Sequence, residues 1–212
     1  MLQGKQMSQT YKTEQETFWA GEFGDDYVDR NQGPAALAAR VALFSRLLPR
    51  TRLIGSAIEL GANIGINLHA LKTLIPELRA TAVEINAKAA AELRAHDWID
   101  VHETSILEYE PAGGHDFAFT SGVMIHINPD ELEKVYHALY AASSHYVGVI
   151  EYYNPAPVEV SYRGHSERLF KRDFAGEMMD MFPDLKLVDY GFAYHRDPVF
   201  PMDDLNWFLL EK

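Results

Sequence analysis

Residues 56–67 read Ser-Ala-Ile-Glu-Leu-Gly-Ala-Asn-Ile-Gly-Ile-Asn: a short apolar run, a turn with two glycines, and the first residues of an apolar helical pattern. Glycine has no Cβ, so a glycine turn between a strand and the following helix lets a ligand approach the backbone closely. The stretch from Gly61 to Gly65 therefore predicts a ligand-binding turn at the carboxyl end of a first strand over 56–60.

The rest of the chain alternates between strand-like and helix-like patterns. Further strands are predicted over 80–85, 99–102, 116–120, 146–150, 186–190 and 207–211. Helices are predicted over 66–74, 87–96, 130–143 and 172–182. This alternation is typical of an α/β fold, with a mostly parallel, doubly wound sheet of seven strands and helices on both faces. No helical pattern separates the last two strands, which predicts a C-terminal antiparallel hairpin.

The segment before the first strand divides into two parts. Residues 1–16 are polar, show no sustained period and are expected to form a flexible arm. Residues 17–50 begin with interleaved aromatic and acidic side chains and continue with a helical pattern that begins at Pro34 and ends at Pro49. We expect a helical cap or lid over 17–50, followed by one domain over 51–212.

Composition narrows the class of protein. The 212 residues carry a formal net charge of −12, which argues against nucleic acid or an anionic membrane surface as a partner. The chain has no cysteine, which excludes disulfides, thiolate metal sites and cysteine nucleophiles. Its nine histidines stand singly, so no metal site is predicted. Without a long apolar segment, the chain is expected to be soluble and cytoplasmic.

Two classes of cofactor compete for the glycine turn. A dinucleotide-binding turn that starts at Gly61 needs glycine at position 63 and glycine or alanine at position 66, but the chain has Asn63 and Ile66. A phosphate-binding loop fails as well, because no Gly-Lys-Ser/Thr follows. The pattern Glu59-x-Gly61-x-Asn63-x-Gly65 instead favours S-adenosylmethionine, whose amino-acid and adenosine parts would face this turn.

Each of these positions has an expected role. Glu59 would accept a hydrogen bond from the ammonium group of the cofactor, and Gly61 leaves room for its approach to the backbone. Glu84 ends the second strand, where a carboxylate can accept both ribose hydroxyls. Ile85 would face the adenine, and Ser121 would line the same crevice from the fourth strand. The alternative is an ordinary tight turn with a solvated Glu84.

Two titratable residues lie where the fourth and fifth strands would end. His126 is a candidate general base near neutral pH, unless its ring simply packs under the next helix. Glu151 is a second candidate base at the edge of the crevice. Tyr152, Tyr153 and Asn154 follow it and are expected to contact the substrate, because aromatic faces beside a carboxylate suit a hydroxyl-rich molecule or an amine. Tyrosine pairs at strand ends also commonly serve packing alone.

One stretch concentrates positive charge in this acidic chain. Its basic residues are Arg163, His165, Arg168, Lys171 and Arg172. Such a cluster would attract a carboxylate or phosphate of the substrate, and arginine can bind either in bidentate fashion. We assign Arg163, His165 and Arg172 to substrate binding. The alternative is a solvated helix start balanced by Glu167 and Asp173.

Several longer stretches resemble one bacterial family. They are FWAGEFGDDYVDRN at 18–31, AIELGANIGIN at 57–67, VMIHINPDELEKVY at 123–136, EYYNP at 151–155, YRGHSERLFKRDFAGEMMD at 162–180 and LVDYGFAYHRD at 187–197. From about Phe18 onward, the chain resembles the small bacterial methyltransferases associated with pseudaminic acid biosynthesis. The glycine turn is common to the whole superfamily, whereas the stretches at 151–155 and 162–180 are typical of a much smaller group of proteins.

This resemblance implies a Rossmann-like class I methyltransferase fold, S-adenosylmethionine as cofactor, and an enzyme that modifies bacterial surface glycans. The implied substrate is a nonulosonic acid sugar or its nucleotide-linked precursor, methylated on oxygen or nitrogen. By analogy, Arg30 and Asn31 would touch the carboxylate end of the cofactor, and Trp19 would close over it as a lid. The residues expected to flank the adenine are Thr104, Ser105 and Ile106.

The chemistry of the acceptor stays open in the sequence. A sulfonium methyl group is already a strong electrophile, so the protein mainly has to align a nucleophile and exclude water. A hydroxyl or an ammonium group would need a base, whereas a carboxylate would need none. Two other functions also remain: a methyltransferase for another small molecule, and a non-catalytic module that binds S-adenosylmethionine and regulates a partner. The sequence indicates no oligomeric state.

Overall fold

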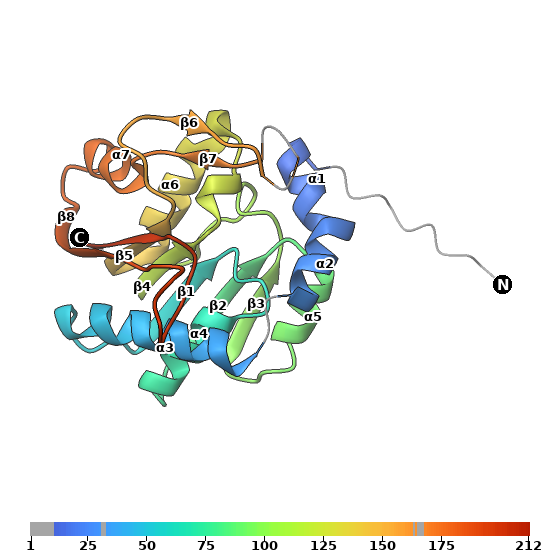
Figure 1. Cartoon of the computed structure of the whole chain (residues 1–212). Coiled ribbons are helices and arrows are strands. Elements are labelled where there is room, and N and C mark those ends of the chain that lie inside the picture. The colour runs from blue at the N-terminus through green and yellow to red at the C-terminus, as the bar shows by residue number, and fades with distance from the viewer. Residues whose placement is uncertain (1–10, 31–32, 163, 165–167) are drawn as a thin grey trace.

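The computed structural model describes residues 11–30, 33–162, 164 and 168–212 (Figure 1). These residues form a seven-stranded sheet in the order β3-β2-β1-β4-β5-β9-β8. The strands are β1 (Ser56–Leu60), β2 (Arg79–Glu84), β3 (Ile99–Glu103), β4 (His115–Ser121), β5 (Ser143–Glu151), β8 (Lys186–Phe192) and β9 (Asn206–Glu211). Strands β1 to β5 run parallel, and β9 runs antiparallel to both β5 and β8. The predicted sheet and its C-terminal hairpin are confirmed.

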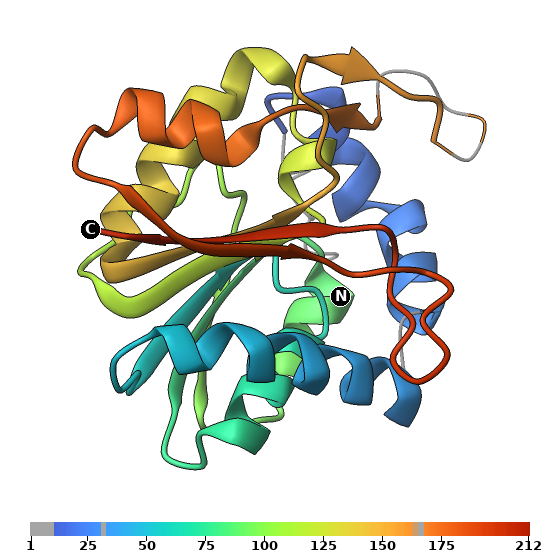
Figure 2. The same ribbon diagram turned by 60° about the vertical axis from the view of Figure 1, so that its left-hand side comes forward.

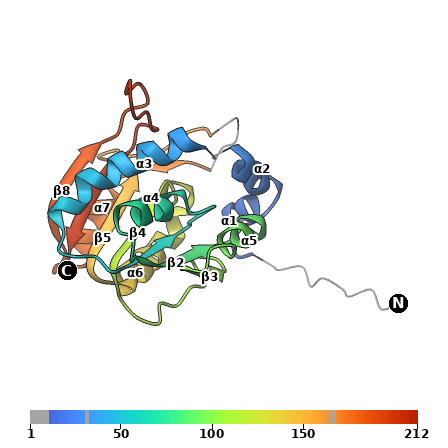
Figure 3. The ribbon, with the colours of Figure 1, turned by 90° about the horizontal axis from the view of Figure 1, so that it is seen from below.

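Helices cover both faces of this sheet (Figures 1 and 2). They are α3 (Pro34–Leu47), α4 (Ile66–Leu74), α5 (Ala87–Leu93), α6 (Leu132–Ala142) and α7 (Phe174–Met181). α3 and α4 share one apolar core with the strands, whereas α6 and α7 share the core on the opposite face. In the first core, Phe44 of α3 packs edge-on against Phe119 of β4, with ring centroids 5.6 Å apart. α5 lies beside the β2–β3 edge, opposite β8 (Figure 3).

The order of the strands positions the site. From β1 the chain builds outward through β2 to β3, then returns to the other side of β1 with β4 and continues to β5. The connections after β1 and β4 therefore leave in opposite directions, which opens a crevice at the carboxyl ends of these two strands. The predicted ligand-binding turn follows β1 and lies at this crevice.

The structure departs from the expected elements in several places, among them the end of α5 at Leu93 in place of residue 96. A short hairpin of β6 (Val158–Glu159) and β7 (Phe170–Lys171) occupies a stretch without a predicted strand. α7 begins at Phe174, two residues later than expected, because the Asp173 side chain caps it by accepting from the Gly176 N–H. α6 is preceded by a 3-10 turn, η3 (Pro129–Glu131), and ends where β5 begins.

Two short helices form the cap. α1 (Glu14–Ala20) and α2 (Glu22–Arg30) lie over the carboxyl ends of the strands, next to α5 (Figures 1 and 3). α1 begins inside the segment that the sequence predicts to be an arm, because Thr13 and Glu16 form a capping box that fixes the first turn. The first ten residues of that arm lie outside the described residues. Among the described residues, no helix is long and apolar enough to cross a membrane.

Candidate functional site

A cleft lies at the carboxyl ends of β1, β2 and β4 and is closed on its outer side by α1 and α2. Ten of the residues predicted to form the site line it: Trp19, Glu59, Gly61, Asn63, Glu84, Ile85, Ser105, Ile106, Ser121 and His126. These residues come from segments that are far apart in the sequence, and the topology of the sheet brings them together.

The turn after β1 requires its glycines. Gly61 and Gly65 have φ angles of 80° and 75°, and Asn63 between them also has a positive φ of 48°. A Cβ on Gly61 would lie 2.6 Å from the Val123 side chain, and one on Gly65 would lie 2.6 Å from Leu93. Gly65 thus faces the packing of α5 and does not line the cleft. Gly65 is the N-cap residue of α4, and glycine readily adopts the left-handed conformation found there.

Glu84, at the end of β2, connects the turn after β1 to the segment after β2 through hydrogen bonds. Its carboxylate accepts the backbone N–H of Asn63 at 2.6 Å and that of Asn86 at 2.7 Å. Burial raises the pKa of this carboxyl, and these hydrogen bonds oppose the rise. A carboxylate held in this way presents its remaining lone pairs at the edge of the cleft, where it can accept further hydrogen bonds.

The other end of the cleft holds polar atoms without partners. Glu59 accepts from the Asn67 side chain through Oε1 at 2.7 Å, and burial raises its pKa to about 8. Among the described residues, Glu59 Oε2, Asn67 Oδ1 and Arg40 Nε are buried and have no hydrogen-bond partner. Arg40 comes from α3 and lies near Glu59, whose carboxylate it stabilises. This end therefore combines a carboxyl group, an amide and a guanidinium.

The cleft is also lined by residues near Glu84 in the fold. They are Ile85, Ser105, Ile106 and Ala89 of α5. Thr104, the third residue predicted to flank an adenine, does not line the cleft, and its N–H bonds to the Glu84 carbonyl at 3.0 Å.

His126 lies in η2 (Met124–His126), a 3-10 turn that follows β4. Its Nδ1 bonds to the backbone carbonyl of Arg168, and its ring lies 4.7 Å from that of Trp19 and 4.9 Å from that of Tyr162. A carbonyl can only accept, so Nδ1 carries the proton and Nε2 keeps its lone pair. Burial lowers the pKa of His126 to about 4, so the ring is neutral at pH 7.

Glu151 occupies a different place from the one predicted for a general base. Its carboxylate accepts the backbone N–H groups of Val123 and Met124 at 3.1 Å each and that of Ile125 at 3.5 Å. The side chain lies beneath η2 and does not line the cleft. Burial raises its pKa to about 7. Glu151 therefore holds the loop that carries His126.

The residues that follow Glu151 do not line the cleft either. The Tyr152 ring lies under the Lys171 ammonium, 4.9 Å from Nζ. Tyr153 packs against Phe208 of β9, and the Asn154 side chain donates to the Ala156 carbonyl. Tyr152 is the member of this group that lies deepest, at the junction of the two cores.

Two of the described residues of the basic cluster form ion pairs. Arg172 Nε donates to Glu177 at 2.7 Å, and Arg168 pairs with Glu14 of α1 at 3.1 Å. Arg163, His165 and Asn31 lie outside the described residues, as does the side chain of Arg30. Arg172 thus pairs with α7 and does not line the cleft, and its contact with a substrate stays a prediction.

Sequence reasoning missed two kinds of residue. Arg40 and Asn67 lie on helices. The helical period in the sequence predicts these helices, but it does not indicate which of their polar side chains faces the cleft. Asn86 caps α5 and also donates to Asp25 at 2.8 Å, which ties α2 to the end of β2. An asparagine just before an alanine-rich helix predicts the cap, but no sequence signal predicts the contact with α2.

Comparison with known proteins identifies the fold. No family model and no curated protein matches this chain. The 1,6-didemethyltoxoflavin-N1-methyltransferase of Burkholderia thailandensis, solved with 1,6-didemethyltoxoflavin and S-adenosylhomocysteine, is 14% identical (TM-score 0.67, covering 93% of this chain and 86% of that chain). Magnesium protoporphyrin IX methyltransferase of Synechocystis PCC 6803, solved with S-adenosylmethionine, is 9% identical (TM-score 0.65, covering 96% and 100%). A methyltransferase dependent on S-adenosylmethionine from Archaeoglobus fulgidus is 12% identical (TM-score 0.65, covering 90% and 100%). The chain therefore has the fold of the methyltransferases that depend on S-adenosylmethionine.

Proposed function

We propose that this protein is a methyltransferase that takes its methyl group from S-adenosylmethionine and acts on a small molecule. The observation that carries the proposal is the cleft itself, in which the β1 turn, Glu84 and the Glu59 end form one continuous wall. The fold shared with methyltransferases of natural products and cofactors supports it.

The side chains that line the cleft fit the cofactor from end to end. The buried and unpartnered atoms of Glu59 and Arg40 suit the ammonium and carboxylate groups of its methionine part. Glu84 suits the two ribose hydroxyls, and the apolar side chains of Ile85 and Ile106 suit the adenine. When bound, the cofactor supplies an electrophilic methyl group on sulfur.

The protein's own residues would then prepare the acceptor. His126 accepts a proton from it through Nε2, because Nδ1 is committed to the Arg168 carbonyl. Glu151 holds the backbone of η2, and so holds His126 in place. Trp19 and the cap exclude water from the reacting atoms.

For the substrate, we propose a nonulosonic acid sugar or its nucleotide-linked form, on the strength of the resemblance at 151–155 and 162–180. Of the described basic residues of the cluster, Lys171 lies over the Tyr152 ring, whereas Arg168 and Arg172 are paired with carboxylates. Incubation with S-adenosylmethionine and either pseudaminic acid or an uncharged sugar tests this choice. Methylation of the uncharged sugar alone would contradict the proposed substrate, and the protein would then be a methyltransferase for another small molecule.

Calorimetric titration with S-adenosylmethionine and with NAD tests the proposed reaction class. We expect micromolar binding of S-adenosylmethionine alone. Glu84→Gln should weaken it about tenfold to a hundredfold, because hydrogen bonds to a charged group are worth about 1.5–3 kcal/mol. Glu92→Gln, on the exposed side of α5, is the matched control and should bind like the wild type. A folded protein that binds only NAD, or neither ligand, would overturn the proposal.

A further inference from the structure

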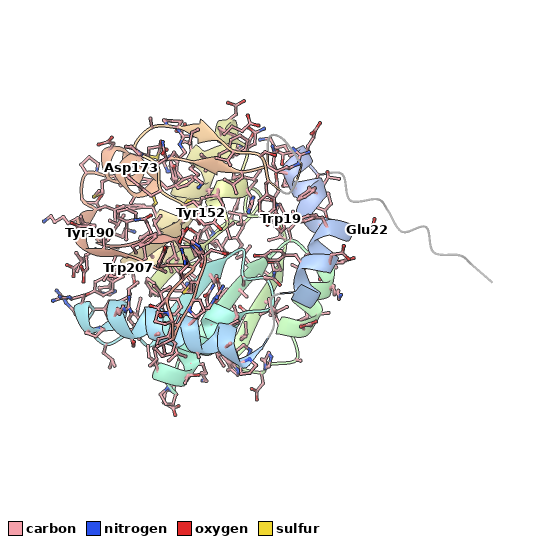
Figure 4. The ribbon with its side chains drawn as sticks, viewed as in Figure 1. Trp19, Glu22, Tyr152, Asp173, Tyr190 and Trp207 are labelled. Atoms are coloured by element: carbon pink, nitrogen blue, oxygen red, sulfur yellow. The ribbon has the colours of Figure 1, made fainter. Side chains whose placement is uncertain are left out.

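The rings of Trp19 and His126 lie next to each other at the cleft, and their free ring nitrogens differ in hydrogen-bonding character. Trp19 Nε1, a donor, is buried without a partner among the described residues. His126 Nε2 also has no hydrogen-bond partner there, and the two rings are 4.7 Å apart at an angle of 52°. Trp19 extends from the inner side of α1, whereas Glu22 on α2 points outward (Figure 4).

The structure fixes which nitrogen can accept. The bond from His126 Nδ1 to the Arg168 carbonyl leaves the lone pair on Nε2. Its ring is wedged between Trp19 and Tyr162, two aromatic groups that offer no negative charge to favour an imidazolium. Trp19 Nε1 can only donate, since an indole has no accepting nitrogen.

This pair selects one chemical class of acceptor. An un-ionised hydroxyl can donate to His126 Nε2 and accept from Trp19 Nε1 with the same oxygen. A carboxylate has no proton for His126, and an ammonium group has no lone pair for Trp19. An un-ionised amine has one lone pair, which cannot accept from Trp19 while it attacks the methyl group, whereas a hydroxyl oxygen has two. An unpartnered buried N–H is unfavourable by about 1–3 kcal/mol, so a ligand that satisfies Trp19 gains affinity. We infer that the protein is an O-methyltransferase whose acceptor is an un-ionised hydroxyl held between Trp19 and His126. This inference rests on the proposed function.

The reaction balances with these two residues. The hydroxyl oxygen forms its bond to the methyl carbon as the sulfur–methyl bond breaks, and S-adenosylhomocysteine leaves as a neutral thioether. The hydroxyl proton moves to His126 Nε2 and is later released to water. The oxygen becomes strongly acidic as its new bond forms, so even a weakly basic imidazole can take this proton. Trp19 keeps its hydrogen bond to the same oxygen throughout and orients the lone pair that attacks.

Three matched probes test the inference without a known substrate. Cyclohexanol, cyclohexylammonium and cyclohexanecarboxylate share one ring and differ only in the functional group. Each is titrated into the full-length, ¹⁵N-labelled protein saturated with S-adenosylhomocysteine, and the indole N–H signals of the three tryptophans are followed by NMR. Trp19→Phe identifies the Trp19 signal, and Trp98, which packs against His69 of α4, serves as the internal control.

We expect cyclohexanol to shift the Trp19 signal and to bind at least about fivefold more tightly than either charged probe. His126→Phe, which keeps an aromatic ring but removes the acceptor, should abolish this preference while S-adenosylhomocysteine still binds. An equal or larger response to the carboxylate or the ammonium probe, or no response to any probe, would overturn the inference. Failure to bind S-adenosylhomocysteine at all would instead defeat the proposed function.

Discussion

At the scale of single residues, the glycine turn restricts most strongly which residue types can occupy a position. Gly61 combines a φ of 80° with a Cβ position 2.6 Å from Val123. We predict that Gly61→Ala lowers the free energy of unfolding by about 1–3 kcal/mol, because a left-handed conformation and a side-chain collision are both imposed. It should also weaken the binding of S-adenosylmethionine. Denaturant unfolding and calorimetry measure the two effects.

A matched control exists in the same chain. A Cβ added at Gly113 would meet no atom within 4 Å, and the φ of this glycine is not positive, so Gly113→Ala should leave both quantities unchanged. Adding Val123→Ala to Gly61→Ala should restore part of the lost stability, since it removes the atoms that collide. Wild-type stability and affinity in Gly61→Ala would contradict the turn described above.

Glu151 shows where residue-level reasoning from sequence stops. Its position at the end of β5 was predictable, but its hydrogen bonds to the backbone amides of Val123 and Met124 were not. We predict that Glu151→Gln destabilises the protein by about 1–3 kcal/mol, because an amide NH₂ then faces a backbone N–H. Its affinity for S-adenosylmethionine should stay near that of the wild type. Unchanged unfolding with lost methyl transfer would return Glu151 to the role of a base.

At the scale of elements, a hydrogen bond between side chains ties α2 of the cap to the end of β2. Asp25 of α2 accepts from Asn86 at 2.8 Å, and we expect Asp25→Ala to speed the dissociation of S-adenosylmethionine about threefold to tenfold, because it loosens α2. Stopped-flow displacement measures this rate. Asp26→Ala removes the neighbouring exposed charge and is the control. Equal dissociation rates in the two variants would mean that the loss of a negative charge, and not the loss of the Asn86–Asp25 hydrogen bond, determines how fast S-adenosylmethionine dissociates.

The elements themselves were predictable where local pattern and tertiary packing agree. β1 and α4 have the bounds that the apolar run and the helical period indicate. The β6–β7 hairpin was not predictable, because two-residue strands carry no period to detect. The start of α1 inside the expected arm was missed for a different reason. The stability of this helix comes from the capping box at Thr13 and Glu16 and from ring contacts such as Trp19 with His126, which join distant parts of the chain.

At the scale of the whole molecule, buried carboxyl groups make stability depend on pH. Burial raises the pKa of Glu151 to about 7 and that of Glu59 to about 8 in the folded state, above their unfolded values. Stability from such groups is complete below the unfolded pKa and is lost as pH rises through the folded pKa. His126, whose pKa is lowered to about 4, acts in the opposite sense and only below about pH 6.5.

We therefore predict that the free energy of unfolding falls as pH rises from about 6.5 to about 8.5 in the ligand-free protein. Thermal unfolding across this range measures the slope. Glu59→Gln should flatten it, and saturating S-adenosylhomocysteine should do the same, because its ammonium group stabilises the charged carboxylate. A stability that rises over this range would show that the two carboxyl groups are not desolvated in the way described.

The most direct test of the whole account is a crystal structure of the protein with S-adenosylhomocysteine. We predict that the ribose hydroxyls lie within hydrogen-bond distance of Glu84, with the adenine between Ile85 and Ile106. The homocysteine end should reach Glu59 and Arg40, and its sulfur should face His126 and Trp19. A ligand bound elsewhere, or bound with its ends reversed, would contradict the assignment of the cleft and the chemistry derived from it.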